Sequence, residues 1–208
     1  AQPFGDAATA DTHSGVAALR EQFPNAIHHY TVMAGDEHVV YIPADRNLEI
    51  LRWLKTSLQY DLLADLTAVD FGGGRPLEVV YQLWSIPNKS ALRVKAMLPL
   101  DALEIQSVEG LWKTADWLER EVFDLFGINF SGHPDMRRIL MPENYAEGHP
   151  LRKDFPLRGR FTRAEQTRRA LEMKFEDFYT PEELSITERN AATGPKPPAE
   201  AAAEGSRS

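Results

Sequence analysis

The chain has 208 residues, 43% of them hydrophobic and 26% charged, with a net charge of −8, which is ordinary for a soluble globular domain with extensions. The absence of cysteine excludes disulfides, thiol catalysis and thiolate-ligated zinc or iron–sulfur sites within this chain. No apolar run reaches the ~20 residues that a membrane-spanning helix needs. The first eleven residues also lack the basic and apolar regions of a secretory signal peptide.

Hydrophobic periodicity in the first 71 residues predicts helices mixed with strands. Pro24 and Asn25 end the first helix, and a turn at 34–36 separates the first two strands. The predicted elements are a helix over 12–23, strands over 26–33 and 37–42, a helix over 48–58 with Asp45 as its N-cap, and a strand over 62–71.

The clearest pattern is a β-hairpin. Apolar residues recur at every second position over 77–84 and again over 91–98, on either side of a loop at 87–89. The glycine run 72–74 precedes it and is followed by Pro76 and a strand, whereas a phosphate-binding loop requires a lysine and a helix. We therefore interpret 72–74 as a connector between strands.

The strongest helix is predicted over 111–126. It carries one apolar stripe, and the large aromatic residues Trp112, Trp117 and Phe123 lie outside that stripe, so we expect the helix to be buried on more than one side. Gly127 is a typical residue for ending a helix. These elements together predict an α+β fold: a mixed or antiparallel sheet with helices packed on it, followed by an extended C-terminal segment.

Regular patterning fades after Gly127, where several residues precede proline and are biased toward extended backbone. Residues 131–170 carry a net charge of +4, so the remaining residues carry −12 of the total −8. A basic segment on an acidic protein indicates a charged partner surface, and a solvated loop with scattered arginines is the alternative. We expect the span after Gly127 to gain its order from a neighbouring polypeptide and not from this chain's own interior.

The predicted organisation has three parts. An α+β domain covers 1–130, an extended partner-wrapping segment covers 131–180, and a tail expected to be disordered covers 181–208. One further helix is predicted over 162–173, where Thr162 and Glu165 can form a capping box.

A cluster of carboxylates on the strongest helix is the first candidate for chemistry. Glu119 and Glu121 point about 200° apart on a helix, which argues against a shared metal. Arg120 and Asp124 are four residues apart and can pair. We interpret the cluster as paired charges on a buried or interfacial helix, and a free-standing acid–base enzyme that uses Glu119, Asp124 and His133 is a disfavoured alternative.

Two histidines are candidate metal ligands. His133 and His149 each precede proline and have no third ligand at a suitable spacing, so we interpret them as turn residues. No Gly-x-Ser-x-Gly motif accompanies Ser131. The acidic balance and the core-like aromatic pattern also argue against a nucleic-acid partner.

Several blocks of the chain resemble the thirty-kilodalton subunit of respiratory complex I. The resemblance spans about 37–157 and departs from the family pattern at 113–115 and after Leu157. The blocks that carry it are DLTAVD at 65–70, DWLEREVFDLFG at 116–127, HPD at 133–135, RRIL at 137–140 and EGHPLRKDFPL at 147–157.

The resemblance implies a non-catalytic structural subunit of the peripheral arm of a proton-translocating NADH:quinone oxidoreductase. Such a subunit binds no cofactor itself, while the complex holds FMN, iron–sulfur clusters and quinone. It packs on the large subunit that helps to build the quinone site, here called the quinone-site subunit, and lies near cluster-bearing subunits. It sits on the cytoplasmic side of the bacterial plasma membrane as a peripheral protein, attached only through the complex.

The resemblance also implies a set of residues at the partner interface. The same module in a membrane-bound hydrogenase, or in a ferredoxin- or F420-dependent quinone reductase, is the alternative. The implied residues are Glu119, Arg120, Glu121, Asp124, His133, Arg137, Arg138, His149, Arg152, Lys153 and Asp154.

Overall fold

The computed structural model describes residues 13–142, 145 and 147–156. The helix predicted over 162–173 and the tail over 181–208 lie outside this part of the chain. The elements in chain order are α1 (Ser14–Gln22), β1 (His29–Met33), β2 (Glu37–Ile42), the 3-10 helix η1 (Ala44–Arg46), α2 (Asn47–Leu58), β3 (Leu62–Val69), β4 (Leu77–Ser85), β5 (Ser90–Leu98), β6 (Glu104–Gln106), α3 (Ala115–Phe126) and β7 (Asn129–Ser131).

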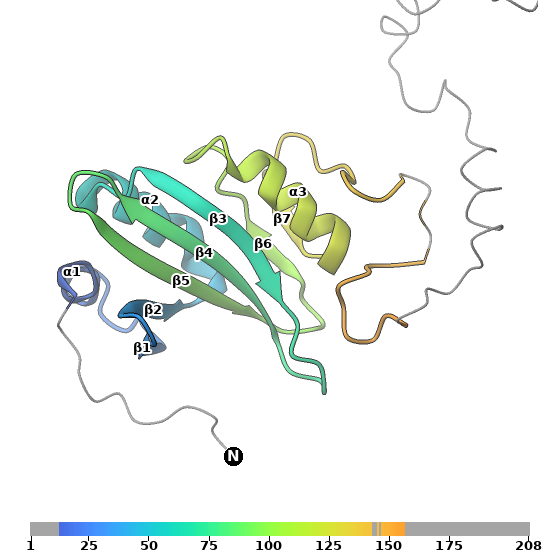
Figure 1. The fold of residues 1–208 in the computed structure, drawn as a ribbon, viewed down its shortest axis with the longest axis horizontal. Coiled ribbons are helices and arrows are strands. Elements are labelled where there is room, and N and C mark those ends of the chain that lie inside the picture. The colour runs from blue at the N-terminus through green and yellow to red at the C-terminus, as the bar shows by residue number, and fades with distance from the viewer. Residues whose placement is uncertain (1–12, 143–144, 146, 157–208) are drawn as a thin grey trace, which may run out of the picture. The chain divides into compact units, whose positions relative to one another are not determined.

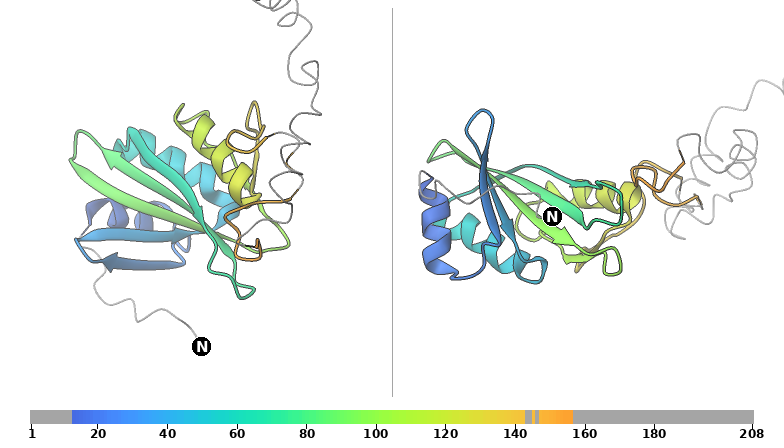
Figure 2. Two further views of the ribbon diagram at one scale, coloured as in Figure 1. Left: turned by 45° about the vertical axis from the view of Figure 1, so that its right-hand side comes forward. Right: turned by 90° about the horizontal axis from the view of Figure 1, so that it is seen from below.

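Five of the described strands form one sheet in the order β1-β2-β5-β4-β3 (Figure 1). Strands β2 and β5 are parallel, and every other neighbouring pair in this sheet is antiparallel. The helices α1 and α2 lie beside each other against the sheet, while α3 packs along the edge strand β3 (Figure 2). The α+β prediction of a mixed sheet with helices packed on it is therefore confirmed.

The hairpin β4–β5 forms as the alternating pattern predicts. Its register pairs Leu77 with Leu98 and Tyr81 with Val94, and these four side chains are buried on the face that the helices cover. The preceding run 72–74 joins the antiparallel strands β3 and β4, which confirms its interpretation as a connector. All three of these glycines have positive φ, a conformation that other residues rarely adopt.

Helix α2 begins differently from the prediction. Asp45 lies inside η1 and not at the N-cap, because the chain makes a tight 3-10 turn before α2 begins at Asn47. The buried Asn47 side chain instead donates hydrogen bonds to the Gln106 carbonyl oxygen at 2.8 Å and the Tyr81 hydroxyl at 3.3 Å. These bonds tie α2 to both the main sheet and β6.

Helix α3 begins at Ala115, because residues 111–114 form turns. Val122 and Phe126 are buried in the core that α3 shares with β3. Trp112, just before the helix, is also buried, and its indole N–H donates to the Asp61 carbonyl oxygen at 3.1 Å. Trp117 is 60% exposed, so the expectation that α3 is buried on more than one side is wrong for the face that carries this residue.

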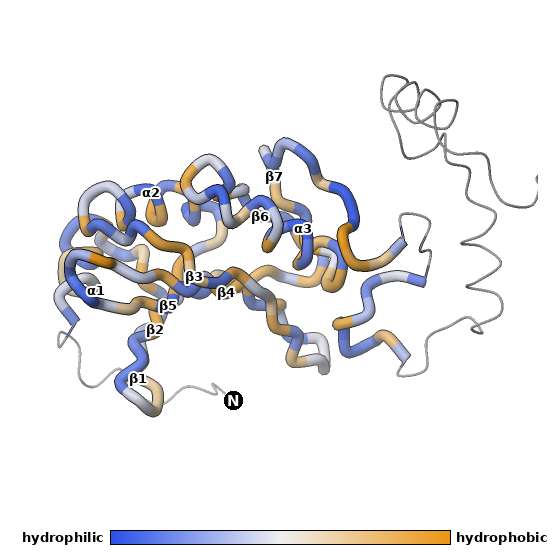
Figure 3. Tube along the Cα trace, turned by 45° about the horizontal axis from the view of Figure 1, so that its top comes forward, coloured by the Kyte–Doolittle hydropathy of each residue, from blue (hydrophilic) through white to orange (hydrophobic). Residues whose placement is uncertain are grey.

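The chain after β7 returns along α3 without forming a further helix or strand in its described part. Hydrophilic and hydrophobic stretches both occur there (Figure 3). The Leu151 backbone N–H donates to the Leu125 carbonyl oxygen at 3.0 Å, and the His149 ring bonds the Asp124 carbonyl oxygen at 2.9 Å. The expectation that a neighbouring polypeptide alone orders this span is corrected here, because helix α3 of the same chain holds it. The boundary at residue 130 stays a prediction.

Gly127 makes this return possible in two ways. It ends α3 with φ of +78°, and a Cβ built on it would lie 2.6 Å from the His149 ring. A side chain here would therefore strain the backbone and displace His149.

We expect Gly127→Ala to lower the free energy of unfolding by about 2 to 3 kcal/mol, the sum of left-handed strain and the clash with His149. Urea denaturation of the purified chain measures it. In a His149→Ala background the clash is absent, so the same substitution should cost only about 1 kcal/mol. Equal losses in the two backgrounds would contradict the steric part of this account.

Candidate functional site

The buried carboxylate of Asp124 is the centre of the contact between α3 and the following segment. Asp124 is fully buried, and its Oδ1 accepts a hydrogen bond from the Arg138 guanidinium at 2.7 Å. Its Oδ2 accepts the backbone N–H groups of Ile139, Leu140 and Met141 at 3.1, 2.8 and 2.8 Å. One carboxylate thus binds three successive peptide groups and one guanidinium.

The electrostatics favour the ionised form of Asp124. Burial by itself would raise the pKa of this carboxyl, but the N–H groups of Met141 and Leu140, then Arg138, and then Ile139 lower the pKa below its ordinary value. A lowered folded-state pKa means that the stabilisation is present above the unfolded pKa of about 3.9 and is lost as pH falls through the lowered value. The contact is therefore fully formed at neutral pH.

The predicted pair of Arg120 with Asp124 is wrong, because Arg138 occupies that carboxylate from 14 residues further along the chain. Arg120 instead donates to the carbonyl oxygens of Arg137 at 3.1 Å and Arg138 at 3.3 Å. Its guanidinium lies 5.2 Å from the centre of the exposed Trp117 ring. Arg120 therefore also fixes the segment, but through the backbone.

Glu119 performs a separate task on another side of α3. Its carboxyl is fully buried and accepts hydrogen bonds from the Ser107 hydroxyl at 2.6 Å and the Val108 backbone N–H at 2.7 Å. Burial raises the pKa of Glu119 to about 7, although these two bonds act in the opposite direction. Glu121 is exposed, so the predicted divergence of the two glutamates is observed.

The two histidines make turn contacts. His133 accepts the Asp135 backbone N–H at Nδ1, 3.0 Å away, which leaves its Nε2–H to donate to the Asp116 carbonyl oxygen at 3.2 Å. His149 donates from Nδ1 to the Asp124 carbonyl oxygen. No group of three His, Asp or Glu in the described part of the chain could hold a metal ion.

The basic residues at 152–154 lie elsewhere, against the loop after β3. Asp70 accepts the Lys153 backbone N–H at 2.8 Å and the Gly72 backbone N–H at 2.7 Å. Arg152 pairs with Asp154 at 3.1 Å. Sequence reasoning missed Asp70 as a site residue; an aspartate just before a glycine run is the local signal that could have identified it.

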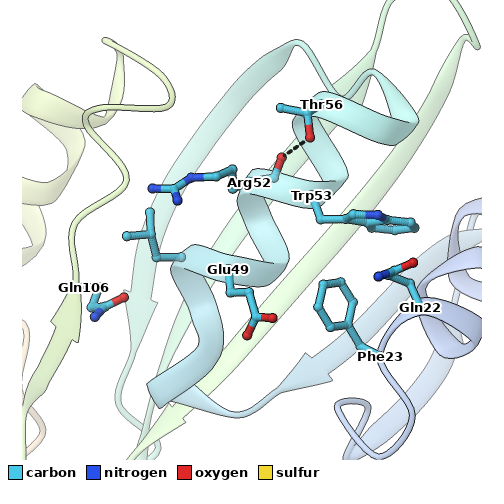
Figure 4. A pocket seen from close by; sticks show the side chains of 8 residues that line it. Gln22, Phe23, Glu49, Arg52, Trp53, Thr56 and Gln106 are labelled. Atoms are coloured by element: carbon cyan, nitrogen blue, oxygen red, sulfur yellow. Dashed lines mark hydrogen bonds between the residues drawn. The ribbon is translucent and has the colours of Figure 1, made fainter.

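A groove between α1 and α2 is a second candidate for a ligand site (Figure 4). Phe23 and Trp53 meet edge to face across it, with ring centres 5.6 Å apart. Its one carboxylate, Glu49, is bonded to Arg46 at 3.0 Å. The groove therefore presents no acid–base pair of the kind that a hydrolytic site needs.

The fold and the site define an α+β domain in which one helix holds an extended segment through a buried carboxylate. Residues 40–161 match the family described as the 30-kilodalton subunit of respiratory-chain NADH dehydrogenase. The chain belongs to this family.

Relatives support this membership. Two proteins named as this subunit of NADH-quinone oxidoreductase, from Citrifermentans bemidjiense and Geobacter sulfurreducens, are each 46% identical over 72% of this chain, and the matches cover 92% and 93% of those proteins. A trypsin-resistant fragment of Nqo5 superposes with a TM-score of 0.51 at 31% identity, over 57% of this chain and 94% of the fragment. A chain of the membrane-bound sulfane sulfur reductase, an archaeal respiratory membrane complex, gives 0.60 at 26% identity, over 79% of this chain and 96% of that one.

We expect Asp124→Asn to release the segment, because an amide is a weaker acceptor for three N–H groups and leaves Arg138 without a counter-charge. Limited trypsin digestion should then cut after Arg138 at least about tenfold faster. Asp135→Asn is the matched control, since Asp135 pairs with the exposed Arg137. Unchanged cleavage in Asp124→Asn would show that the carboxylate does not hold the segment.

Glu119 should make stability depend on pH. The folded state holds this proton more tightly than the unfolded chain, so stability falls as pH rises from about 4.3 to about 7. Glu119→Gln has no proton to lose, and its loss of stability between pH 5 and pH 8 should be smaller by about 2 kcal/mol. Urea denaturation at both pH values measures this, with the exposed Glu121→Gln as control. Parallel pH profiles for all three proteins would refute the assignment.

Proposed function

We propose that this chain is a structural subunit of the peripheral arm of a proton-translocating NADH:quinone oxidoreductase, packs on the quinone-site subunit, and has no active site of its own. The observation that carries the proposal is the family match over 40–161, which includes both the domain and the tethered segment. Relatives that share nearly their full length with this chain are named as a subunit of that enzyme. As a family member, the chain is a subunit of this enzyme complex.

Exposed apolar side chains support a role in assembly. Trp117 and Leu140 are each 60% exposed and Leu151 is 50% exposed, all on α3 or the segment tethered to it. Large apolar groups on a surface mark contacts with partners, and tryptophan and arginine are enriched where binding energy concentrates. Arg120 already orders the Trp117 ring, so little side-chain entropy remains to be lost on docking.

The chemistry of the complex belongs to other subunits. FMN, the iron–sulfur clusters and quinone are their cofactors, and this chain has no cysteine for a cluster. In the described part of the chain, no helix is long and apolar enough to cross a membrane. We infer that the subunit lies on the cytoplasmic side of the plasma membrane and attaches to it through its partners, without contacting nucleic acid.

A second assignment rests on the likeness to the archaeal sulfane sulfur reductase complex. The same module could serve a related membrane complex, such as a hydrogenase or a ferredoxin- or F420-dependent quinone reductase. The component that accepts the incoming electrons distinguishes these complexes. Mild-detergent purification through a tag on this chain should recover the quinone-site subunit together with the NADH-oxidising subunits. Recovery of the quinone-site subunit with a different electron-input protein would favour the second assignment.

We expect Trp117→Ala to lower the amount of assembled complex, since an exposed, ordered indole in an interface contributes about 2 kcal/mol or more to binding. Native gel electrophoresis of membranes measures the assembled fraction. Ile86→Ala is the matched control, because Ile86 is 61% exposed but lies in the β4–β5 turn. The isolated variant should unfold at the same urea concentration as the parent. Full assembly with Trp117→Ala would remove this face from the proposed interface.

A further inference from the structure

A cleft opens between the β3–β4 loop, the turn after β5 and residues 152–154. Asp70 builds it, because its carboxylate binds the backbone N–H groups of Gly72 and Lys153 and so joins the loop to the segment. These two bonds, with the nearby charges of Arg152 and Lys153, lower the pKa of Asp70 despite its burial. Asp70 is therefore ionised and fully engaged at neutral pH.

The lysine stem is seated by the absence of a side chain at Gly72. A Cβ at Gly72 would lie 3.1 Å from Cβ and 3.2 Å from Cγ of Lys153. Only the backbone N–H of Lys153 is used in the tether, and its side chain is exposed. The ammonium group is thus held beside the cleft, with no hydrogen bond to any group in the described residues.

The charges that line the cleft leave two cations unbalanced. Arg152 and Asp154 neutralise each other at 3.1 Å, and Asp70 is engaged by backbone groups. Arg75 donates only to carbonyl oxygens, those of Phe71 at 3.0 Å and Gly72 at 3.4 Å. Arg75 and Lys153 therefore carry positive charge without a carboxylate partner among the described residues, on a chain whose net charge is −8.

Apolar groups stand next to these cations. Phe71 is 44% exposed, with the Arg75 guanidinium 4.8 Å from its ring centre, and Leu100, which lines the cleft, is 40% exposed. Two separated cations beside apolar side chains fit a carboxylate next to an apolar residue. The Asp70 and Asp154 carboxylates in the same cleft disfavour a doubly charged phosphate by like-charge repulsion.

We propose that this cleft binds a segment of a neighbouring subunit in which an Asp or Glu side chain pairs with Lys153 and Arg75 and an adjoining apolar side chain packs on Phe71 and Leu100. The proposal rests on the proposed function, because it requires a partner subunit. It adds a second contact surface, with its own chemistry, to the exposed face of α3.

Photo-crosslinking in the assembled complex tests the proposal. Leu100→benzoylphenylalanine, irradiated in native membranes, should form a cross-link to another subunit. Mass spectrometry should place that cross-link within a few residues of an Asp or Glu. The same photoreactive residue at Ile86 is the control and should give no such product. Lipid adducts alone, no adduct, or a cross-linked peptide without a carboxylate would overturn the proposal.

Charge variants then test the pairing. Lys153→Glu should lower the yield of the Leu100 cross-link about fivefold, whereas Lys153→Arg should keep most of it. Lys89→Glu, at an exposed position in the β4–β5 turn, should leave the yield unchanged. An undiminished yield with Lys153→Glu overturns the pairing. If the tagged chain recovers no other subunit at all, the proposed function fails first, which separates the two failures.

Discussion

One buried carboxylate organises the part of this protein that follows its sheet. Asp124 lies on α3 with no exposed surface, and removing such a charge from water is costly unless it is fully bonded. Three successive backbone N–H groups and the Arg138 guanidinium satisfy it. The described part of the segment therefore follows one path along α3 although it contains no helix or strand of its own after β7.

This arrangement separates two kinds of surface. Polar groups face inward and hold the segment, while Trp117, Leu140 and Leu151 face outward. A chain with few apolar residues to bury gains order from charge-assisted hydrogen bonds and keeps its apolar side chains for contacts with other subunits. Asp70 repeats the device further along the segment, where it captures the Lys153 backbone and leaves the side chain exposed.

Local periodicity predicted the regular elements well. The β4–β5 hairpin and the end of α3 at Gly127 follow from alternation and from the conformational freedom of glycine. The pairing of Asp124 was out of reach, because the rule for neighbours four residues apart favoured Arg120, whereas the true partner lies 14 residues away on a returning segment. Trp117 was misjudged because an aromatic residue outside the core stripe reads the same whether a partner covers it or solvent does.

Hydrogen exchange at the backbone amides of residues 139–141 in the isolated chain tests the central claim most directly. If the Asp124 carboxylate holds these groups, their exchange at neutral pH is slowed well below the rate of an unstructured peptide, without any partner subunit present. Exchange at the unstructured rate in the lone chain, with protection appearing only in the assembled complex, would contradict the claim and return the ordering of this segment to its neighbours.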